Sequence, residues 1–273
     1  IGYGGNDTVY GGAGNDLIET QVDGASLDEI HAGAATEGNR LVLNGTLAGT
    51  MVIDLSAADQ IVSVAGVAEV LAQDGINHVD ASALLGFSAS RTGNGLANNL
   101  VGTIKDDTLA GGAGADTLVG GGGNDVFIVG PLAEFPGSES VAGGDGTDLL
   151  QFDSNVAGQT LVLSGARVAD VEAVEITGLV ALNVNAAGLK NAVAITGNDQ
   201  ANSLTATPYA DTLTGGGGAD TLTGGAGNDV YLIGDAADFA VGERIGDSAG
   251  TADRIRFDSS VAADELVLGA TVT

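Results

Sequence analysis

The sequence predicts an all-β fold, a parallel β-roll or β-solenoid of glycine-rich loops and short aliphatic strands. A nine-residue pattern recurs in three blocks of the chain, and the 273 residues include 46 Gly but no Cys and no Trp. Apolar residues make up 44% of the chain, whereas aromatic residues make up only 4%. Many thin repeated layers bury small aliphatic side chains better than one bulky globular centre does, so we expect a repetitive core.

The nine-residue pattern occupies residues 2–19, 93–128 and 197–232. The second block reads GNGLANNLV, GTIKDDTLA, GGAGADTLV and GGGGNDVFI without a gap, and the third block follows the same plan. The eighth place of every unit is apolar, and this place predicts the inward residue of a strand. The sixth place is always Asp or Asn, at Asp7, Asp16, Asn98, Asp107, Asp116, Asp125, Asn202, Asp211, Asp220 and Asp229.

These units resemble the repeats of the RTX family, whose motif is G-G-x-G-x-D-x-U-x. The resemblance implies a right-handed parallel β-roll with several Ca²⁺ ions held between stacked loops. It also implies export by a type I secretion system, and hence a secreted, extracellular or cell-surface location on a bacterium. The matching nonapeptides cover about a third of the chain.

The stacking of the loops gives a physical reason for a cation. A nonapeptide supplies a six-residue turn and a three-residue strand, so two nonapeptides complete one coil, and adjacent coils lie about 4.8 Å apart. Two carboxylates at roughly 5 Å repel by about 1 kcal/mol in water and by about 3 kcal/mol at an effective dielectric of 20. A flexible cage of carboxylate and carbonyl oxygens suits Ca²⁺ better than Mg²⁺ or Zn²⁺. The expected stacked pairs are Asp107 with Asp125, Asp211 with Asp229, Asn98 with Asp116, and Asn202 with Asp220.

The expected metal ligands are the sixth-place side chains and the carbonyl groups of the second and fourth places. One further loop is expected at GGDGTDLLQ with Asp148, and a weaker one around Asp253. Departures from the pattern predict weaker sites, namely Lys105 and Tyr209 at the fourth place, Ala206 at the first, and Asn98 and Asn202 at the sixth. The carbonyl ligands are expected from Gly12, Gly14, Gly112, Gly114, Gly121, Gly123, Gly216, Gly218, Gly225 and Gly227.

A longer repeat of 104 to 105 residues lies over the nonapeptides. LLQFDSNVAGQTLVLSGARV at 149–168 is echoed by RIRFDSSVAADELVLGATV at 254–272. We therefore divide the chain into units 1–92, 93–196 and 197–273, each a nonapeptide block followed by a less regular β segment. Strands expected near Leu163, Val174, Val184 and Ile195 favour a continuous solenoid, and the alternative is a small β-sandwich between rolls. The third unit stops early, so we expect a fragment of a longer array.

The net charge narrows the range of expected binding partners. The formal net charge of −28 predicts no nucleic-acid partner and no attraction to anionic membranes. No apolar run approaches the length of about 20 residues that a membrane span needs, so no membrane insertion is expected. Ordering 46 glycines is costly in conformational entropy, which predicts an unfolded or molten chain without Ca²⁺.

The search for catalytic motifs predicts no enzyme. GDSAG at 246–250 matches the G-x-S-x-G pattern of a nucleophile elbow, but that fold needs a His after the Ser. Both histidines, His31 and His78, lie far upstream of this segment, and no H-E-x-x-H zinc motif occurs.

Three functions remain open on the sequence. The first is a structural array outside the cell, a surface-layer protein or repeat adhesin, which would self-associate into a layer or filament or bind a cell-surface polysaccharide. The second is the calcium-binding tail of a type I-secreted hydrolase or epimerase. The third is a soluble calcium-binding or ice-binding module. The 104-residue tandem repeat favours the first.

Overall fold

The computed structural model describes residues 8–22, 29–33, 38–45, 49–54, 61–64, 67–68, 73–74, 76–133, 135, 137–234, 238, 242–246, 250 and 252–258. It divides into two compact units. The first unit comprises Ile1–Ile128 and Ala133–Asp148, and the second comprises Val129–Leu132 and Leu149–Thr273. This division by contacts does not test the three sequence units, which stay an expectation.

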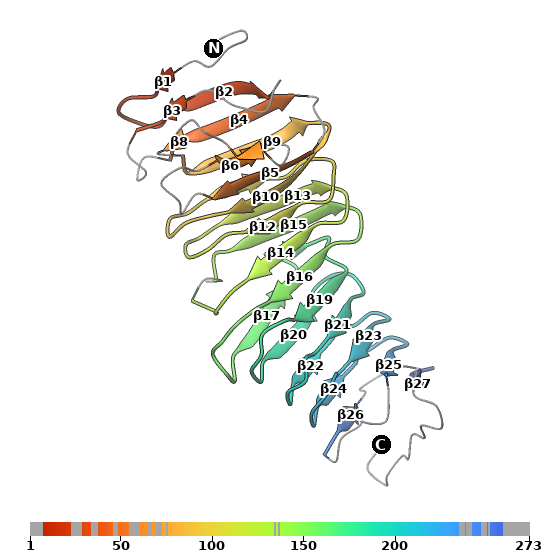
Figure 1. The fold of residues 1–273 in the computed structure, drawn as a ribbon. Helices are drawn as coiled ribbons and strands as arrows, with labels where there is room; N and C mark the ends of the chain where they lie inside the picture. Colours follow the sequence, from red (N-terminus) through yellow and green to blue (C-terminus); the bar gives the residue numbers. More distant parts are fainter. Residues whose placement is uncertain are drawn as a thin grey trace. The chain divides into compact units, whose positions relative to one another are not determined.

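The first unit contains strands β1 to β15, most of which are short. Figure 1 shows them as stacked rungs, coloured red to green. Their bounds are β1 Thr8–Tyr10, β2 Leu17–Val22, β3 Glu29–His31, β4 Arg40–Gly45, β5 Gly49–Asp54, β6 Ile61–Val64, β7 Val67–Ala68, β8 Gln73–Asp74, β9 His78–Leu84, β10 Phe87–Thr92, β11 Asn99–Val101, β12 Thr108–Ala110, β13 Thr117–Gly122, β14 Val126–Val129 and β15 Ser140–Asp145.

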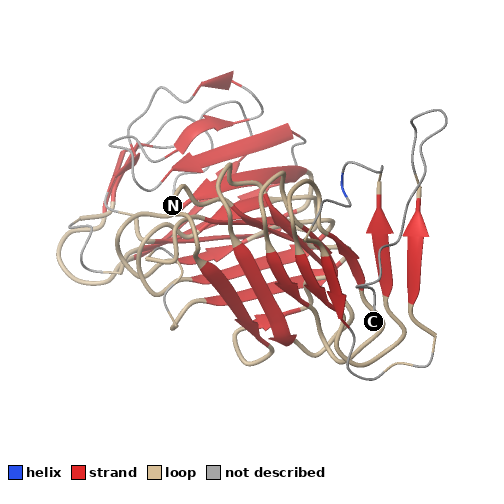
Figure 2. Ribbon diagram, turned by 90° about the horizontal axis from the view of Figure 1, so that it is seen from below, coloured by secondary structure: helices blue, strands red, loops and turns tan. Residues whose placement is uncertain are grey.

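The second unit contains strands β16 to β27, and in Figure 2 the strands are red and the loops that join them are tan. Their bounds are β16 Leu149–Phe152, β17 Thr160–Ser164, β18 Val168–Ala169, β19 Ala173–Ile176, β20 Asn183–Gly188, β21 Ala194–Thr196, β22 Ser203–Thr205, β23 Thr212–Thr214, β24 Thr221–Thr223, β25 Val230–Ile233, β26 Arg244–Gly246 and β27 Arg254–Phe257. No helix among the described residues is long and apolar enough to cross a membrane.

Successive strands alternate between two parallel sheets, and this alternation makes each unit a β-roll. In the first unit β10, β12 and β14 pair in parallel in one sheet, while β9, β11, β13 and β15 pair in parallel in the other. In the second unit β19, β21, β23, β25 and β27 form one sheet, and β17, β20, β22, β24 and β26 form the other. The predicted parallel β-roll is confirmed.

The core of each roll is a column of eighth-place side chains. Each three-residue strand has one inward side chain because successive side chains point to opposite faces of a sheet. The eighth-place residues of the second and third blocks are at most 2% exposed, namely Leu100, Leu109, Leu118, Phe127, Leu204, Leu213, Leu222 and Tyr231. Burial of this column is the main apolar contribution to stability, at about 25 cal/mol for each Å² removed from water.

The irregular segment of the second unit continues the roll. Strands β17, β19, β20 and β21 contain the four expected positions. Strand β19 pairs in parallel with β21, which pairs in parallel with β23 of the nonapeptide block. On the other sheet β17 pairs in parallel with β20, and β20 with β22. A β-sandwich inserted in this segment is therefore excluded.

The first unit departs from an all-parallel roll at one place. Strand β5 pairs with β6, and β6 with β7, in antiparallel register. Only residues 65 and 66 separate β6 from β7, and such a short connection allows an antiparallel hairpin but not a parallel crossover. The irregular segment of the first unit thus includes a hairpin that the expectation of a uniform solenoid missed.

A basic residue lies in the core of the first unit. Arg91 on β10 is 1% exposed, and its guanidinium makes no hydrogen bond with any described residue. The residue 104 positions later is Ile195, which is also buried. Burial lowers the pKa of Arg91 to about 10, while the negative charges of Asp107, Asp80 and Asp125 raise it. Arg91 therefore stays charged at neutral pH and is a fixed cation near those carboxylates.

Candidate metal-binding loops

The polar residues that directly precede the strands form two ladders in each unit. In a ladder, the side chain of one residue accepts a hydrogen bond from the backbone N–H of the residue one coil earlier, except that the Asn98 side chain instead donates from Nδ2 to the Asn77 carbonyl. The first ladder of unit one is Asp16, Asn39, Asn77, Asn98, Asp116 and Glu139, and its second ladder is Asp107, Asp125 and Asp148. In unit two the first ladder is Asn202, Asp220 and Glu243, and the second is Asp211, Asp229 and Asp253.

The stacking predicted for the sixth place is confirmed by these bonds. The Asp107 N–H donates to Asp125 Oδ1 at 2.8 Å, across a step of 18 residues. The Asn98 N–H donates to Asp116 Oδ1 at 2.7 Å, again across 18 residues. Asp148 extends the second ladder, because the Asp125 N–H donates to Asp148 Oδ1 at 2.7 Å across 23 residues.

The corresponding bonds recur in unit two. The Asp211 N–H donates to Asp229 Oδ1 at 2.9 Å, and the Asn202 N–H donates to Asp220 Oδ1 at 2.8 Å. Asp253 takes the place of Asp148, since it accepts from the Asp229 N–H at 2.9 Å.

The second carboxylate oxygen identifies the positions that are suited to a cation. Asp116, Asp125 and Asp220 are fully buried, and their Oδ2 atoms have no hydrogen-bond partner among the described residues. Each Oδ2 lies against the Cα of the first-place glycine of its own loop, so a Cβ there would collide with the carboxylate. A buried charge is costly unless it is paired or coordinates a metal, so these oxygens fit Ca²⁺ ligands.

Burial without a cation also raises the pKa values of these acids. Burial raises the pKa of Asp125 to about 7, and the nearby charges of Asp107 and Asp148 raise it further. Burial likewise raises the pKa values of Asp116 and Asp220 to about 6. A bound divalent cation would reverse this effect by favouring the charged form.

Backbone carbonyls of neighbouring loops stack beside the carboxylates. Gly121 has φ +108°, and a Cβ added to it would strike the carbonyl oxygen of Thr103, one coil earlier. Gly123 has φ +104° and would strike the backbone of Lys105 in the same way. The other second- and fourth-place glycines predicted as carbonyl ligands also have positive φ, namely Gly12, Gly14, Gly112, Gly114, Gly216, Gly218, Gly225 and Gly227. Glycine therefore permits both the left-handed turn and the close approach of loops.

Two of the predicted sites differ from the others because a threonine already satisfies their aspartate. The Thr207 N–H donates to Asp211 Oδ2 at 2.8 Å, and the Thr207 hydroxyl donates to the same carboxylate. Thr103 donates its N–H and hydroxyl to Asp107 in the same way. These are the two loops in which Tyr209 and Lys105 replace glycine. Hydrogen bonds to a carboxylate stabilise its charge without a metal, which agrees with the expectation of weaker sites there.

The asparagines at the sixth place cap the nonapeptide blocks. Asn98 Oδ1 accepts from the Asn94 N–H at 2.8 Å, and its Nδ2 donates to the Asn77 carbonyl at 2.7 Å. Asn202 makes the matching bonds to the Asn198 N–H at 3.0 Å and to the Leu182 carbonyl at 2.7 Å. A carboxylate could not donate the second bond, so Asn suits the coil that follows an irregular segment.

Glu139 and Glu243 belong to the ladders but were not predicted from the sequence. Each lies one residue before a strand, β15 or β26, and each accepts from an aspartate N–H across 23 residues. They are themselves 104 residues apart, and this spacing is the signal that could have found them. Asn39 and Asn77 were missed too, because neither lies in a nonapeptide.

Asp7 lies outside the described residues, and every other predicted side-chain ligand lies in a ladder. Eight of the ten predicted glycines lie against the loop one coil earlier, whereas a Cβ on Gly12 or Gly14 would meet no atom within 4 Å. No group of three or more His, Cys, Asp or Glu side chains converges among the described residues. The carboxylates therefore meet in pairs, and backbone carbonyls or water must supply the remaining oxygens of a six- to eight-coordinate ion.

Comparison with known families agrees with this geometry. The family model of the RTX calcium-binding nonapeptide repeat (four copies) matches residues 1–20, 92–127 and 196–231, roughly a third of the chain. Those three segments contain the loops of the sixth-place ladders. No match was found among curated proteins.

Proposed function

We propose, from the RTX calcium-binding nonapeptide repeats that this chain carries, that it is part of an extracellular structural array, a surface-layer protein or repeat adhesin. The repeats make it a calcium-binding β-roll protein. The proposal rests on the duplication of a whole repeat unit within the chain. The ladder that ends at Asp116 and Glu139 recurs 104 residues later at Asp220 and Glu243. A tandem copy of a whole loop-and-segment unit is the architecture of an array rather than of one compact tail.

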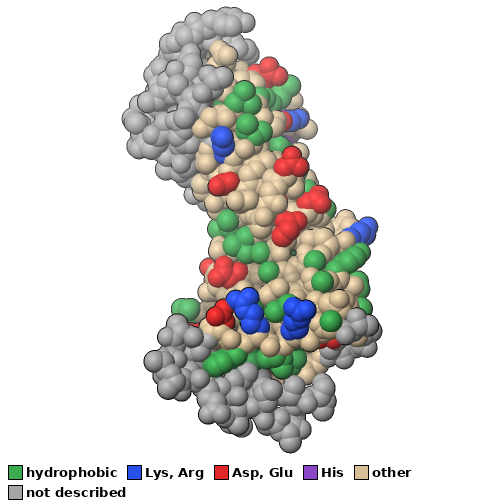
Figure 3. All heavy atoms as spheres, turned by 90° about the vertical axis from the view of Figure 1, so that its right-hand side faces the viewer, with side chains coloured by type: hydrophobic (Ala, Val, Ile, Leu, Met, Phe, Trp, Pro, Cys, Tyr) green, Lys and Arg blue, Asp and Glu red, His purple; other side chains and the backbone are tan. Residues whose placement is uncertain are grey.

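The negative net charge of the chain suits assembly through bound Ca²⁺. Figure 3 shows one face on which acidic, basic and hydrophobic side chains are scattered among other residues and backbone. With a formal net charge of −28, copies of the chain repel one another unless cations neutralise them. Ca²⁺ bound in the ladders removes part of that charge, and further Ca²⁺ on the surface would bridge neighbouring copies into a layer or filament.

The difference in calcium concentration would also keep the chain unfolded during export and folded outside the cell. The buried carboxylates of the ladders oppose folding when no cation is present, because their charged forms lose hydration. We propose that the chain passes a type I secretion system unfolded at low internal calcium and folds outside the cell, where calcium is abundant.

The test is a calcium titration of metal-free protein, followed by circular dichroism and light scattering, with equal Mg²⁺ as the control. Strand signal that requires Ca²⁺, followed by growth of large assemblies, is the expected result. Folding on Ca²⁺ with a persistent monomer would overturn the array and favour the tail of a secreted hydrolase or epimerase. Full strand content in chelator would overturn the role of calcium in folding.

A further inference from the structure

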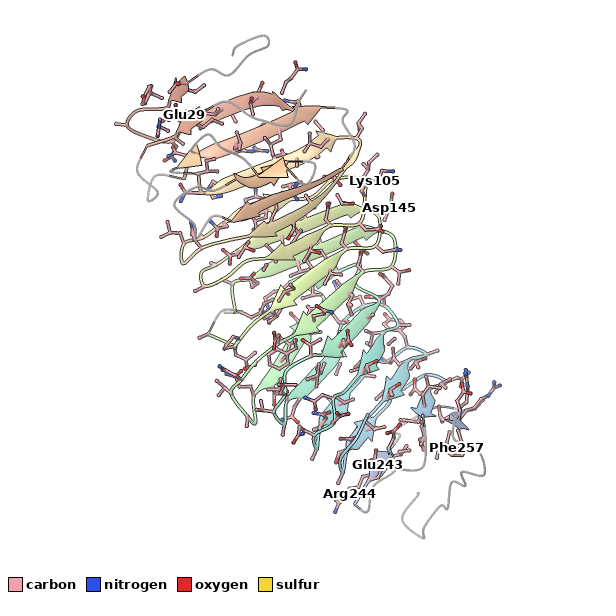
Figure 4. All side chains as sticks on the ribbon, viewed as in Figure 1. Glu29, Lys105, Asp145, Glu243, Arg244 and Phe257 are labelled. Atoms are coloured by element: carbon pink, nitrogen blue, oxygen red, sulfur yellow. The ribbon has the colours of Figure 1, made fainter. Side chains whose placement is uncertain are left out.

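Each nonapeptide block is followed by a buried glutamate that belongs to no nonapeptide. Glu139 is 2% exposed and Glu243 is 7% exposed, whereas Glu is rarely buried unless it is paired. Figure 4 shows Glu243 where the chain enters β26. Glu139 occupies the corresponding place before β15. Both therefore lie where the chain completes its first long coil after the block of nine-residue steps.

Both glutamates use one carboxylate oxygen to hold the loop. The Asp116 N–H donates to Glu139 Oε2 at 3.1 Å, and the Asp220 N–H donates to Glu243 Oε2 at 2.8 Å. In unit one the other oxygen faces the aspartate. An ideal Cβ on Gly111 would lie 2.8 Å from Glu139 Oε1 and 2.5 Å from Asp116 Oδ2, so both atoms flank the same point over that glycine.

In both units the aspartate of the pair lacks a cationic partner among the described residues. Asp116 and Asp220 are fully buried, and their Oδ2 atoms have no hydrogen-bond partner in the described part of the chain. No described Lys, Arg or His lies within ion-pair distance of Asp116, Asp220 or Glu243. In unit two the negative charge of Asp238 adds to the repulsion at Asp220. The same buried acid pair is thus built twice, and in each copy the aspartate keeps one buried oxygen that no described donor satisfies.

We propose that Glu139 and Glu243 are calcium ligands, and that each completes an Asp–Glu site with the last aspartate of the first ladder in its unit. The proposal rests on the calcium-binding function proposed above and adds two sites outside the repeat motif. Ca²⁺ accepts carboxylates in either mono- or bidentate mode, so the hydrogen-bonded Oε2 need not leave its N–H donor.

The sites would couple the irregular segments to calcium. The chain between Asp125 and Glu139, and between Asp229 and Glu243, is where the nine-residue step ends. An ion held by Asp116 and Glu139 would fix the far end of that chain to the nonapeptide coil. Folding of the β segment would then follow calcium binding and not depend on its own short strands alone.

The test uses the full chain with Glu139→Gln, Glu243→Gln and both together. Gln keeps the oxygen that accepts from the aspartate N–H but removes the charge. The matched control is the double variant Glu19→Gln with Glu175→Gln, one residue in each unit and neither in a ladder. Bound calcium is measured by equilibrium dialysis at fixed free Ca²⁺, with circular dichroism to confirm that each variant is folded.

Each single variant should lose one bound Ca²⁺ or bind it at least about tenfold more weakly, and the double variant should lose two. The control should match the parent. Glu139→Asp, which keeps the charge and shortens the reach, should bind more weakly than the parent and more tightly than the Gln variant. A double Gln variant with parental stoichiometry and affinity overturns the inference and leaves the calcium-binding function intact. A parent that binds no Ca²⁺ overturns the proposed function itself. If the double variant fails to fold, the single variants decide, because the other unit keeps its glutamate.

Discussion

Replacing Gly121 with Ala should strongly destabilise the roll. Gly121 has φ +108°, a region that residues with a Cβ rarely adopt, and the new Cβ would strike the carbonyl oxygen of Thr103. Strain of this kind costs about 1 to 3 kcal/mol. Overpacking against a fixed backbone adds about 1 to 3 kcal/mol. The free energy of unfolding should therefore fall by about 2 to 6 kcal/mol.

The control is Gly95→Ala, in the third place of a loop of the same unit. No atom lies within 4 Å of a Cβ on Gly95, and its φ is outside the left-handed region. That change should alter stability by less than about 1 kcal/mol, and it would be stabilising if it mainly restricts the unfolded chain.

The assay is thermal unfolding at saturating Ca²⁺, followed by circular dichroism. One kcal/mol shifts the midpoint of a chain of this size by roughly 2 to 4 °C, so Gly121→Ala should lower it by at least about 4 °C. The calcium concentration needed for folding should rise as well, because a strained loop must be offset by more binding. Equal midpoints for Gly121→Ala and Gly95→Ala would refute the stacking of Gly121 on Thr103.

Three further outcomes are expected. Asp125→Asn should reduce bound Ca²⁺ by one, whereas Asp107→Asn should leave the count unchanged; dialysis that shows equal losses would contradict the assignment. Thr207→Val removes the hydroxyl bonds to Asp211 and should lower the unfolding free energy by about 1.5 to 3 kcal/mol in denaturant titrations, and an unchanged midpoint would disprove the capping role. Burial raises the pKa values of Asp125 and Glu243 to about 7 from their ordinary values of 3.8 and 4.5. Because the folded pKa values are the higher ones, their contribution to metal-free folding is fully present below about pH 4 and is lost as the pH rises through 7. Strand content of metal-free protein should fall over that window, and a rise would contradict the argument.

The nonapeptide register could be predicted because it is periodic. The positions of Leu109, Leu118 and Leu213 in the core follow from the eighth place alone, and the stack of Asp107 on Asp125 follows from two units per coil. The strands near Leu163, Val174, Val184 and Ile195 could also be placed, since aliphatic residues mark each inward position.

The register can no longer be predicted where the number of residues per coil changes. Glu139 meets Asp116 only because β15 pairs with β13 across 23 residues, and the intervening chain gives no sign of which residue will complete the coil. The antiparallel pairing of β5 with β6 could not be predicted either, because the nonapeptide period implies parallel strands only.

Sequence by itself determined the repeat, the parallel roll, the column of apolar side chains and the kind of ion that the loops suit. These properties are local and recur at a fixed period, so each copy supports the same interpretation. Only the tertiary structure decided which carboxylates keep an unsatisfied oxygen. Asp125 keeps one and Asp107 does not, because Thr103 lies within hydrogen-bonding distance of Asp107. Whether a buried charge is satisfied depends on atoms that neighbouring loops bring to it, and those atoms are fixed by the stacking of coils rather than by any motif.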